Sequence, residues 1–284
     1  MDPDQIKKIK GLSLLGEVYT HRLQNEFKRF GNIEKDWRVA LKFFLKNYAF
    51  ERQGAPKAYP DSAVKAFDLA DKKADRPGKD LAKEVWKKFC QLIPATNPDR
   101  NPLSTKEDPQ SIDILSFCAQ MDKYGYNIFQ FALDGIKKDL LQTHNSLVKI
   151  RGIGPKIASF FLRDVAFLGN ISINELEKLQ DRSLLQPVDV WVRRTVSFLD
   201  GSSGQKDEEI AKRLVEMAVA AQCCPLSLNA GAWYLGAKIA TTDQRLTDCL
   251  KDMDELKKNI EKWLSPRQEE TKKLSEVFDK IKEI

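Results

Sequence analysis

IRGIGPKIA, residues 150–158, restricts the fold of this chain more than any other stretch, because it is typical of a tight turn between two helices. Gly152 and Gly154 are suited to positive φ angles, which other residues rarely adopt. Pro155 fits the first turn of a helix, where its missing N–H costs no hydrogen bond. Apolar residues at helical spacing follow through Phe167. The stretch therefore predicts a helical hairpin over about residues 139–167.

The turn of such a hairpin points successive backbone N–H groups outward at a helix N-terminus, which makes a concave donor site for a phosphate oxygen. Phosphate contacts position a protein on DNA without reading its bases. Lys149, Arg151 and Lys156 add positive charge beside the turn. A plain connection between two helices is the alternative interpretation. The residues expected to contact a DNA backbone are Lys149, Arg151, Gly152, Ile153 and Gly154.

The rest of the chain also has a helical pattern and predicts an all-α fold. Apolar residues recur at spacings of three and four, and no alternating strand pattern is present. Helix-breaking residues fall between the predicted helices rather than in one linker, and the longest irregular stretch is residues 94–109. The expected helices span Val39–Phe50, Asp61–Ala74, Asp80–Leu92, Ile112–Tyr124, Ile128–Leu141, Lys156–Phe167, Glu208–Ala221 and a last segment from about Pro266.

Composition limits the class of protein. The 284 residues are 42% hydrophobic, which is enough to bury a core, and the formal net charge of +6 suits an anionic partner. The sequence contains neither an apolar run long enough to span a membrane nor the apolar stretch of a secretory signal. We therefore expect an intracellular protein without a membrane partner, in the cytoplasm or nucleoid, or in the nucleus of a eukaryote.

Cysteine and histidine are too sparse to indicate a metal site. The five cysteines include no CxxC pair, which argues against both an iron–sulfur cluster and zinc. His21 and His144 have no partner pattern, so we expect structural roles for both. No metal and no other cofactor is predicted, while a monovalent cation at the hairpin stays open.

A second stretch, LLQPVDVWVRRTVSFL at residues 184–199, predicts an extended approach through Pro187 and a helix that begins near Val190. Asp189 stands at the N-cap position, where a carboxylate accepts hydrogen bonds from backbone N–H groups. The helix dipole also favours the ionised form of a capping carboxylate, which suits a group that stabilises positive charge nearby. A cap and a catalytic carboxylate are therefore compatible roles for Asp189.

Three elements together resemble a known family. GIGPKIA (residues 152–158), PVDVWVRR (residues 187–194) and LNAGAWYLGAKI (residues 228–239) are similar to elements of the helix-hairpin-helix/GPD superfamily of DNA glycosylases, which includes endonuclease III and the 8-oxoguanine glycosylases. The resemblance covers roughly Trp37–Ile239, and the hairpin and the PVD element are its specific parts. It implies a two-lobed all-α fold with a helical barrel over residues 35–165. Residues 1–34 and 166–284 would form a second lobe that carries the aspartate, with the site in the cleft between the lobes.

The same resemblance implies roles for two residues. Lys156 takes the position of the hairpin lysine that marks the bifunctional branch, whose members are both glycosylases and AP lyases, and Asp189 takes the position of the catalytic aspartate. These two residues are 33 positions apart, because the segment Gly169–Gln186 lengthens the connection between them. The archaeal 8-oxoguanine glycosylases are similar in having an extended segment there. Oxidised guanine is therefore the leading expectation for the excised base.

An enzyme of this kind flips its target nucleotide out of the duplex and fills the gap with a side chain. Arg52 and Gln53, in the loop FERQGAPKAYP, are candidates for the wedge or the base pocket, with a solvated loop as the alternative. Trp191 is a candidate for stacking on the flipped base, with a core position as the alternative. We expect a monomer that binds double-stranded DNA containing a modified base.

Three other functions stay open at this point. A monofunctional glycosylase would use water activated by Asp189 and leave Lys156 on a phosphate. A non-enzymatic helix-hairpin-helix protein would bind DNA and need neither residue for chemistry. A protein-interaction module would leave the hairpin and the PVD element unexplained. Base release from modified duplexes separates the glycosylases from the binding proteins.

Overall fold

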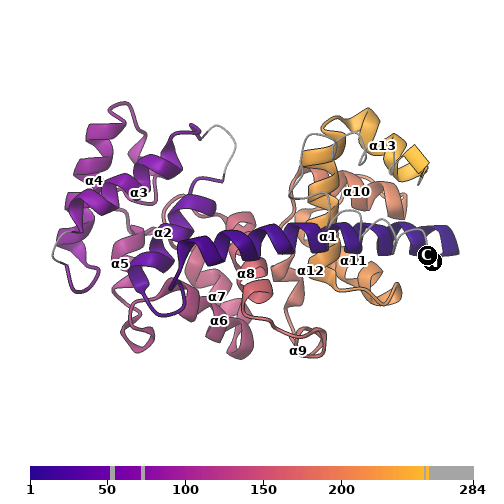
Figure 1. The fold of residues 1–284 in the computed structure, drawn as a ribbon, viewed down its shortest axis with the longest axis horizontal. Coiled ribbons are helices and arrows are strands. Elements are labelled where there is room, and N and C mark those ends of the chain that lie inside the picture. Colours follow the sequence, from indigo (N-terminus) through magenta and orange to yellow (C-terminus); the bar gives the residue numbers. More distant parts are fainter. Residues whose placement is uncertain (52–54, 72–73, 253, 256–284) are drawn as a thin grey trace. The chain divides into compact units, whose positions relative to one another are not determined.

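The computed structural model describes residues 1–51, 55–71, 74–252 and 254–255 (Figure 1). These residues form helices joined by turns and loops, and within these ranges the only β-type pairing is a bridge between Ile112 and Ile150. The expected all-α class is therefore confirmed for the described residues. None of the described helices has the length and apolar character needed to cross a membrane.

The chain folds as two compact units. The central unit consists of Glu26–Asn170, and the terminal unit consists of Met1–Asn25 together with Ile171–Ile284. The first boundary falls within helix α1 (Pro3–Phe30). The sequence-based division placed the boundaries of the barrel at residues 35 and 165, so the observed central unit is longer at both ends.

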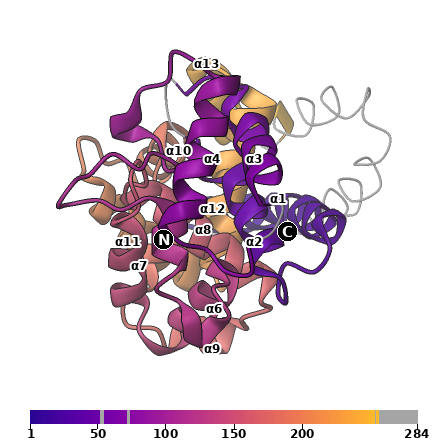
Figure 2. The same cartoon turned by 90° about the vertical axis from the view of Figure 1, so that its left-hand side faces the viewer.

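The central unit begins with the end of α1 and continues through a series of mostly short helices. α3 and α4 lie side by side, as Figures 1 and 2 show, and α6, α7 and α8 contact one another. The elements are α2 (Trp37–Asn47), α3 (Tyr59–Ala70), α4 (Lys79–Leu92), η1 (Pro98–Arg100), α5 (Ile114–Cys118), η2 (Asp122–Tyr124), α6 (Ile128–Lys138), α7 (Leu140–Val148) and α8 (Pro155–Leu168).

Aromatic side chains pack α8 against α2 and the residues that follow α2. The ring of Phe161 lies edge-on to the rings of Phe44 and Tyr48, with centroids 4.9 and 5.1 Å apart. All three side chains are buried. Edge-to-face pairs of this kind add about 0.5–1.5 kcal/mol each to the burial of their area. The second helix of the predicted hairpin is therefore fixed to the core of the central unit.

The same helix carries a buried ion pair. Arg163 and Asp164 are each about 1% exposed, and Nη2 of Arg163 lies 2.9 Å from Oδ1 of Asp164. The hydroxyl of Tyr48 donates to Oδ2 of Asp164 at 3.1 Å, and the guanidinium lies 4.8 Å from the ring centroid of Phe160. A buried charge is tolerated only where it is paired and hydrogen-bonded. The network therefore fixes the orientation of α8 as well as its position.

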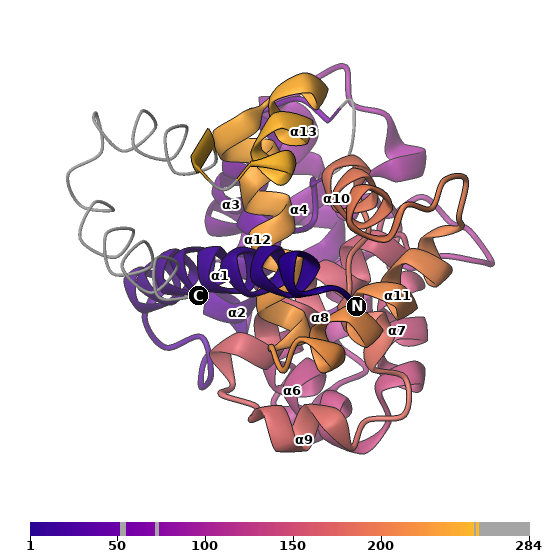
Figure 3. The ribbon, with the colours of Figure 1, turned by 90° about the vertical axis from the view of Figure 1, so that its right-hand side faces the viewer.

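The terminal unit combines most of α1 with the helices after Asn170 (Figure 3). Its core is apolar and includes Leu12, Leu15, Val192, Leu214 and Leu228. The elements after α1 are α9 (Ile173–Glu177), η3 (Arg182–Leu185), α10 (Val190–Asp200), α11 (Asp207–Ala220), α12 (Pro225–Tyr234), the π-helical segment η4 (Leu235–Ala240) and α13 (Asp243–Lys251).

Two glycines allow α1 and α12 to approach at backbone distance within the terminal unit. A Cβ atom at Gly231 would lie 1.8 Å from the carbonyl oxygen of Leu12, and one at Gly16 would lie 2.0 Å from that of Ser227. Both distances are far below van der Waals contact, so neither position accepts a side chain without moving a helix. The first part of α1 is thereby fixed against the helix that follows Cys224.

Most of the predicted helices appear in the structure, but two predicted segments are divided. Ile112–Tyr124 was expected to be one helix, whereas α5 ends at Cys118 and a separate short helix, η2, begins at Asp122. Ile128–Leu141 is divided at Asp139, whose N–H donates to Gly135 and whose side chain accepts from the N–H of Gln142 at 2.8 Å. Asp139 thus ends α6 and caps α7. The helix expected from about Pro266 lies outside the described residues.

Candidate functional site

The predicted hairpin is formed by α7 and α8 and the turn between them. Gly152 has φ +75°, a conformation that favours glycine, as the sequence predicts. Gly154 has φ −92° and ψ 175°, which any residue adopts, so the expected positive φ at this position is wrong. Pro155 is the first residue of α8, as expected. The turn therefore needs one glycine, Gly152, for its backbone geometry.

Several backbone N–H groups of the turn have no hydrogen-bond partner among the described residues. The N–H groups of Arg151 and Ile153 donate to the carbonyl oxygens of Ile112 and Ile150, at 2.9 and 3.0 Å. The N–H groups of Gly152, Gly154 and Lys156 have no acceptor in the part of the chain that the structure describes. The last two stand at the N-terminus of a 14-residue helix, whose dipole favours an anion. We call these three N–H groups the turn donors.

Gly154 borders open space. A Cβ atom at this position would meet no atom of the described residues within 4 Å, and the backbone angles allow any residue. Nothing in the described structure therefore requires a glycine at this position. Close approach of a ligand backbone to the turn is a physical reason for the missing side chain.

Arg151 does not present its charge at the surface of the turn. Its guanidinium donates hydrogen bonds to the carbonyl oxygens of Ser104 and Lys106, and only 3% of the residue is exposed. This burial is at odds with the predicted phosphate contact. Instead, Arg151 fastens the loop before α5 to the turn. A charged residue in a turn is usually solvated, and no sequence pattern marks the carbonyl groups that receive this guanidinium.

Ile153 is also turned inward, since it is 3% exposed and its N–H is bonded to Ile150. Its side chain therefore anchors the turn in the core. Lys149 and Lys156, in contrast, are exposed, and neither forms an ion pair with another described residue. The turn therefore presents two lysine side chains together with the turn donors.

His144 braces the two helices of the hairpin from within. Its Nε2 lies 3.2 Å from the carbonyl oxygen of Pro155 and 3.2 Å from Oγ of Ser159, and the residue is 5% exposed. Burial lowers the pKa of His144, and the hydrogen bond with Pro155 opposes that shift. The expected structural role for this histidine agrees with its position.

Asp189, in the terminal unit, is the N-cap of α10. Its Oδ1 accepts hydrogen bonds from the N–H groups of Trp191 and Val192, both at 2.9 Å, so the capping role predicted from the sequence is confirmed. Its Oδ2 has no donor in the described part of the chain, and the residue is half-buried. One oxygen thus fixes the carboxylate in place while the other can accept from, or stabilise charge on, a ligand.

The segment before Asp189 is held by a residue that the sequence did not reveal. Asn229 of α12 is fully buried, and its Nδ2 donates to the carbonyl oxygen of Pro187 at 3.1 Å. Pro187 and Val188 are buried as well. Asn229 lies within the stretch LNAGAWYLGAKI, where a lone Asn among apolar residues is the pattern that could have identified it.

Trp191 is packed into the terminal unit. A Cβ atom at Gly236 would lie 2.7 Å from the indole, and the guanidinium of Arg194 lies 5.3 Å from the ring centroid. The ring would have to leave these contacts to stack on a base, so its geometry favours the core alternative. Arg52 and Gln53, the other candidates for a wedge or pocket, lie outside the described residues.

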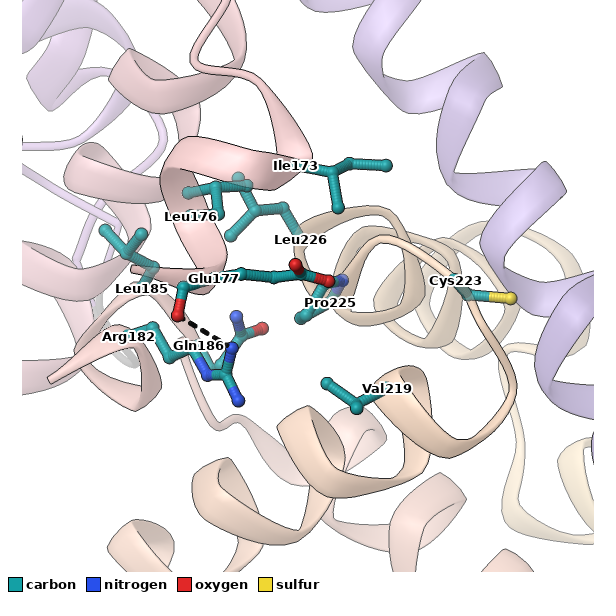
Figure 4. A pocket seen from close by; sticks show the side chains of 10 residues that line it. All are labelled: Ile173, Leu176, Glu177, Arg182, Leu185, Gln186, Val219, Cys223, Pro225 and Leu226. Atoms are coloured by element: carbon teal, nitrogen blue, oxygen red, sulfur yellow. Dashed lines mark hydrogen bonds between the residues drawn. The ribbon is translucent and has the colours of Figure 1, made fainter. Parts of the chain in front are cut away.

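A small pocket lies beside the PVD segment (Figure 4). Gln186 points into it, and neither end of its buried amide has a hydrogen-bond partner in the described ranges. Arg182 and Glu177 contribute polar groups, and Nη1 of Arg182 donates to the carbonyl oxygen of Glu177 at 3.4 Å. The free volume is about 10 Å³, which is the space that one water molecule needs. This pocket is therefore too small for a nucleobase.

Comparisons with protein-family models, with curated proteins and with solved structures found no match. Within the described ranges, no group of three or more His, Cys, Asp and Glu side chains is arranged to hold a metal ion.

Proposed function

We propose that this protein is a DNA glycosylase that excises a modified base and cuts the strand as an AP lyase. The observation that carries the proposal is the turn between α7 and α8, where N–H groups with no acceptor among the described residues lie beside the exposed Lys156. A phosphate group of DNA matches such a donor set in charge and geometry. In this proposal α7 and α8 form a helix-hairpin-helix element, and the two units correspond to the lobes of the glycosylases that the chain resembles.

Lys156 is the proposed nucleophile. Its neutral amine attacks C1′ of the flipped nucleotide, the bond from C1′ to the base breaks, and the base leaves with the bonding electrons and takes up a proton. Loss of the amine proton and opening of the sugar ring give a Schiff base between Nζ and C1′. Removal of a proton from C2′ then expels the 3′ phosphate by β-elimination, which cuts the strand.

Asp189 is the proposed charge-stabilising group. Breakage of the glycosidic bond builds positive charge on the deoxyribose, and a fixed carboxylate lowers the energy of that state. The cap on α10 leaves Oδ2 for this role. The mechanism requires Lys156 and Asp189 to act on the same nucleotide. The proposed partner is double-stranded DNA inside the cell, bound by a monomer, with oxidised guanine as the leading substrate.

The test is base release and strand cleavage on a panel of duplexes that each carry one modified base, with 8-oxoguanine, oxidised pyrimidines and uracil included. Wild type is expected to release one of these bases and to cut the strand without added alkali. Lys156→Gln and Asp189→Asn should each lose both activities while still binding DNA. Lys138→Gln removes an exposed lysine that is paired with Asp134, and it should behave as wild type. Undiminished strand cleavage by Lys156→Gln would overturn the proposal.

A monofunctional glycosylase is the second candidate, because the exposed Lys156 beside the turn donors also suits a phosphate contact. Asp189 would then activate a water molecule as the nucleophile. In that case Lys156→Gln releases the base with weaker DNA binding, and wild type leaves an intact abasic strand. The same panel therefore separates the two candidates.

A further inference from the structure

α4 presents an aligned row of positive side chains. Lys79, Lys83 and Lys87 are exposed and follow one another at intervals of four residues, which places them on one face of the helix. None of the three forms an ion pair with another described residue. Lys88 on the same helix is different, because its Nζ lies 3.4 Å from the carboxylate of Glu84. We call the first three residues the α4 lysine row.

Two residues of the α4 lysine row and one residue of the hairpin turn line the same open depression of the central unit. Lys79 and Lys83 line an open depression of about 600 Å³, and Arg151 of the turn lines it as well. Although the guanidinium of Arg151 is engaged with backbone carbonyl groups, its charge adds positive potential beneath this surface. Two lysines of the row and the base of the turn, at Arg151, therefore share one depression.

Acidic side chains in the depression decide where an anion can lie. Glu107, Asp108 and Asp113 belong to its lining. The carboxylates of Asp108 and Asp113 accept hydrogen bonds from the backbone N–H groups of Gln110 and Ser116, both at 2.8 Å. These carboxylates would repel a phosphate inside the depression. A polyanion is therefore expected to lie over the exposed lysine side chains of α4 and away from these carboxylates.

We propose that the α4 lysine row contacts the phosphate backbone of the duplex that the hairpin turn binds. This inference rests on the proposed function, because the duplex on the turn is its starting point. The row extends over about 12 Å of helix. Over that length, one strand of B-DNA presents about three phosphates, because each strand carries one phosphate for about every 3.4 Å along the helix axis. The row thus lengthens the contact with DNA beyond the turn, without reading the sequence.

The experiment measures binding of an undamaged duplex by fluorescence anisotropy over a series of salt concentrations. Each phosphate contact steepens the dependence of log K on log salt by about 0.9. We expect the slope of log K against log salt to be shallower than that of wild type by about 2.7 in the triple variant Lys79→Gln, Lys83→Gln, Lys87→Gln. A decrease in slope of at least about 0.9 supports the proposal. The positions are exposed, so the far-UV circular dichroism should match wild type.

The matched control is Lys42→Gln, Lys46→Gln, Lys88→Gln, which removes the same charge from the same unit. Each of these lysines is paired with a carboxylate, those of Asp68, Asp61 and Glu84. The control is expected to keep the slope of wild type. An equal loss of slope in both triple variants would show a general charge effect and overturn the proposal.

Two further outcomes separate this inference from the proposed function. If wild type binds no duplex at all, both fail. If wild type binds and Gly154→Val abolishes binding, while the row variant keeps the wild-type slope, the turn retains its proposed role and the α4 lysine row does not contact DNA.

Discussion

Substitution of Asp189 separates the two roles assigned to one carboxylate. Asp189→Ala removes the acceptor of two backbone hydrogen bonds, each 2.9 Å long, and loss of an N-cap typically costs about 1 kcal/mol and up to about 2. If the free energy of unfolding falls by about 2 kcal/mol per molar of urea, the unfolding midpoint should decrease by about 0.5–1 M. Asp189→Asn keeps an acceptor oxygen but removes the charge, so its midpoint should stay close to that of wild type.

Three measurements test this prediction: urea unfolding, hydrogen exchange at the amides of Trp191 and Val192, and base release. Asp189→Ala should lose protection at both amides, whereas Asp189→Asn should keep it. Both variants should lose base release, because neither retains the negative charge. Normal base release by Asp189→Asn would refute the electrostatic role. Equal loss of stability in both variants would refute the capping role.

Four other substitutions and a pH change follow from the geometry. Gly152→Ala should destabilise the protein by about 1 kcal/mol because of its φ of +75°. Gly154→Ala should keep the urea midpoint but weaken binding to duplexes of every sequence, and a sequence-selective loss would contradict the phosphate role. Gly231→Ala should lower the free energy of unfolding by about 2–3 kcal/mol, since its Cβ would meet the carbonyl oxygen of Leu12, and a wild-type urea midpoint would contradict the close helix crossing. Burial lowers the pKa of His144 in the folded protein. As the pH falls, the imidazole therefore takes up a proton near pH 6.5 in the unfolded chain and only at a lower pH in the folded protein. Stability should therefore fall as the pH drops below that value and level off below the folded pKa; His144→Gln should flatten this dependence in urea titrations at several pH values.

Local patterns in the sequence predicted the elements that depend on neighbouring residues. Pro155 and Gly152 mark the turn because a fixed φ and a positive φ are properties of single residues. Asp189 was placed as a cap because an N-cap bonds to amides two and three residues later. In both cases the chemistry lies within a few residues of the sequence.

Long-range partners were not predictable in the same way. Arg151 is buried because carbonyl groups more than forty residues earlier in the chain receive its guanidinium. Asn229 supports Pro187 from a helix 42 residues later. Asp139 divides a continuous apolar pattern because its side chain caps α7, so that α6 ends at Lys138. Each of these outcomes depends on contacts that spacing alone does not encode.

The central claim is tested most directly by trapping the Schiff base with borohydride and mapping the adduct by mass spectrometry. A duplex carrying the base that wild type releases should give a covalent adduct on Lys156. Because a modified lysine resists trypsin, the adduct should appear on the fragment Gly152–Arg163. Lys149→Gln should still give the adduct at saturating enzyme, and Lys156→Gln should give none. An adduct on another lysine, or base release by wild type without any adduct, would contradict the account.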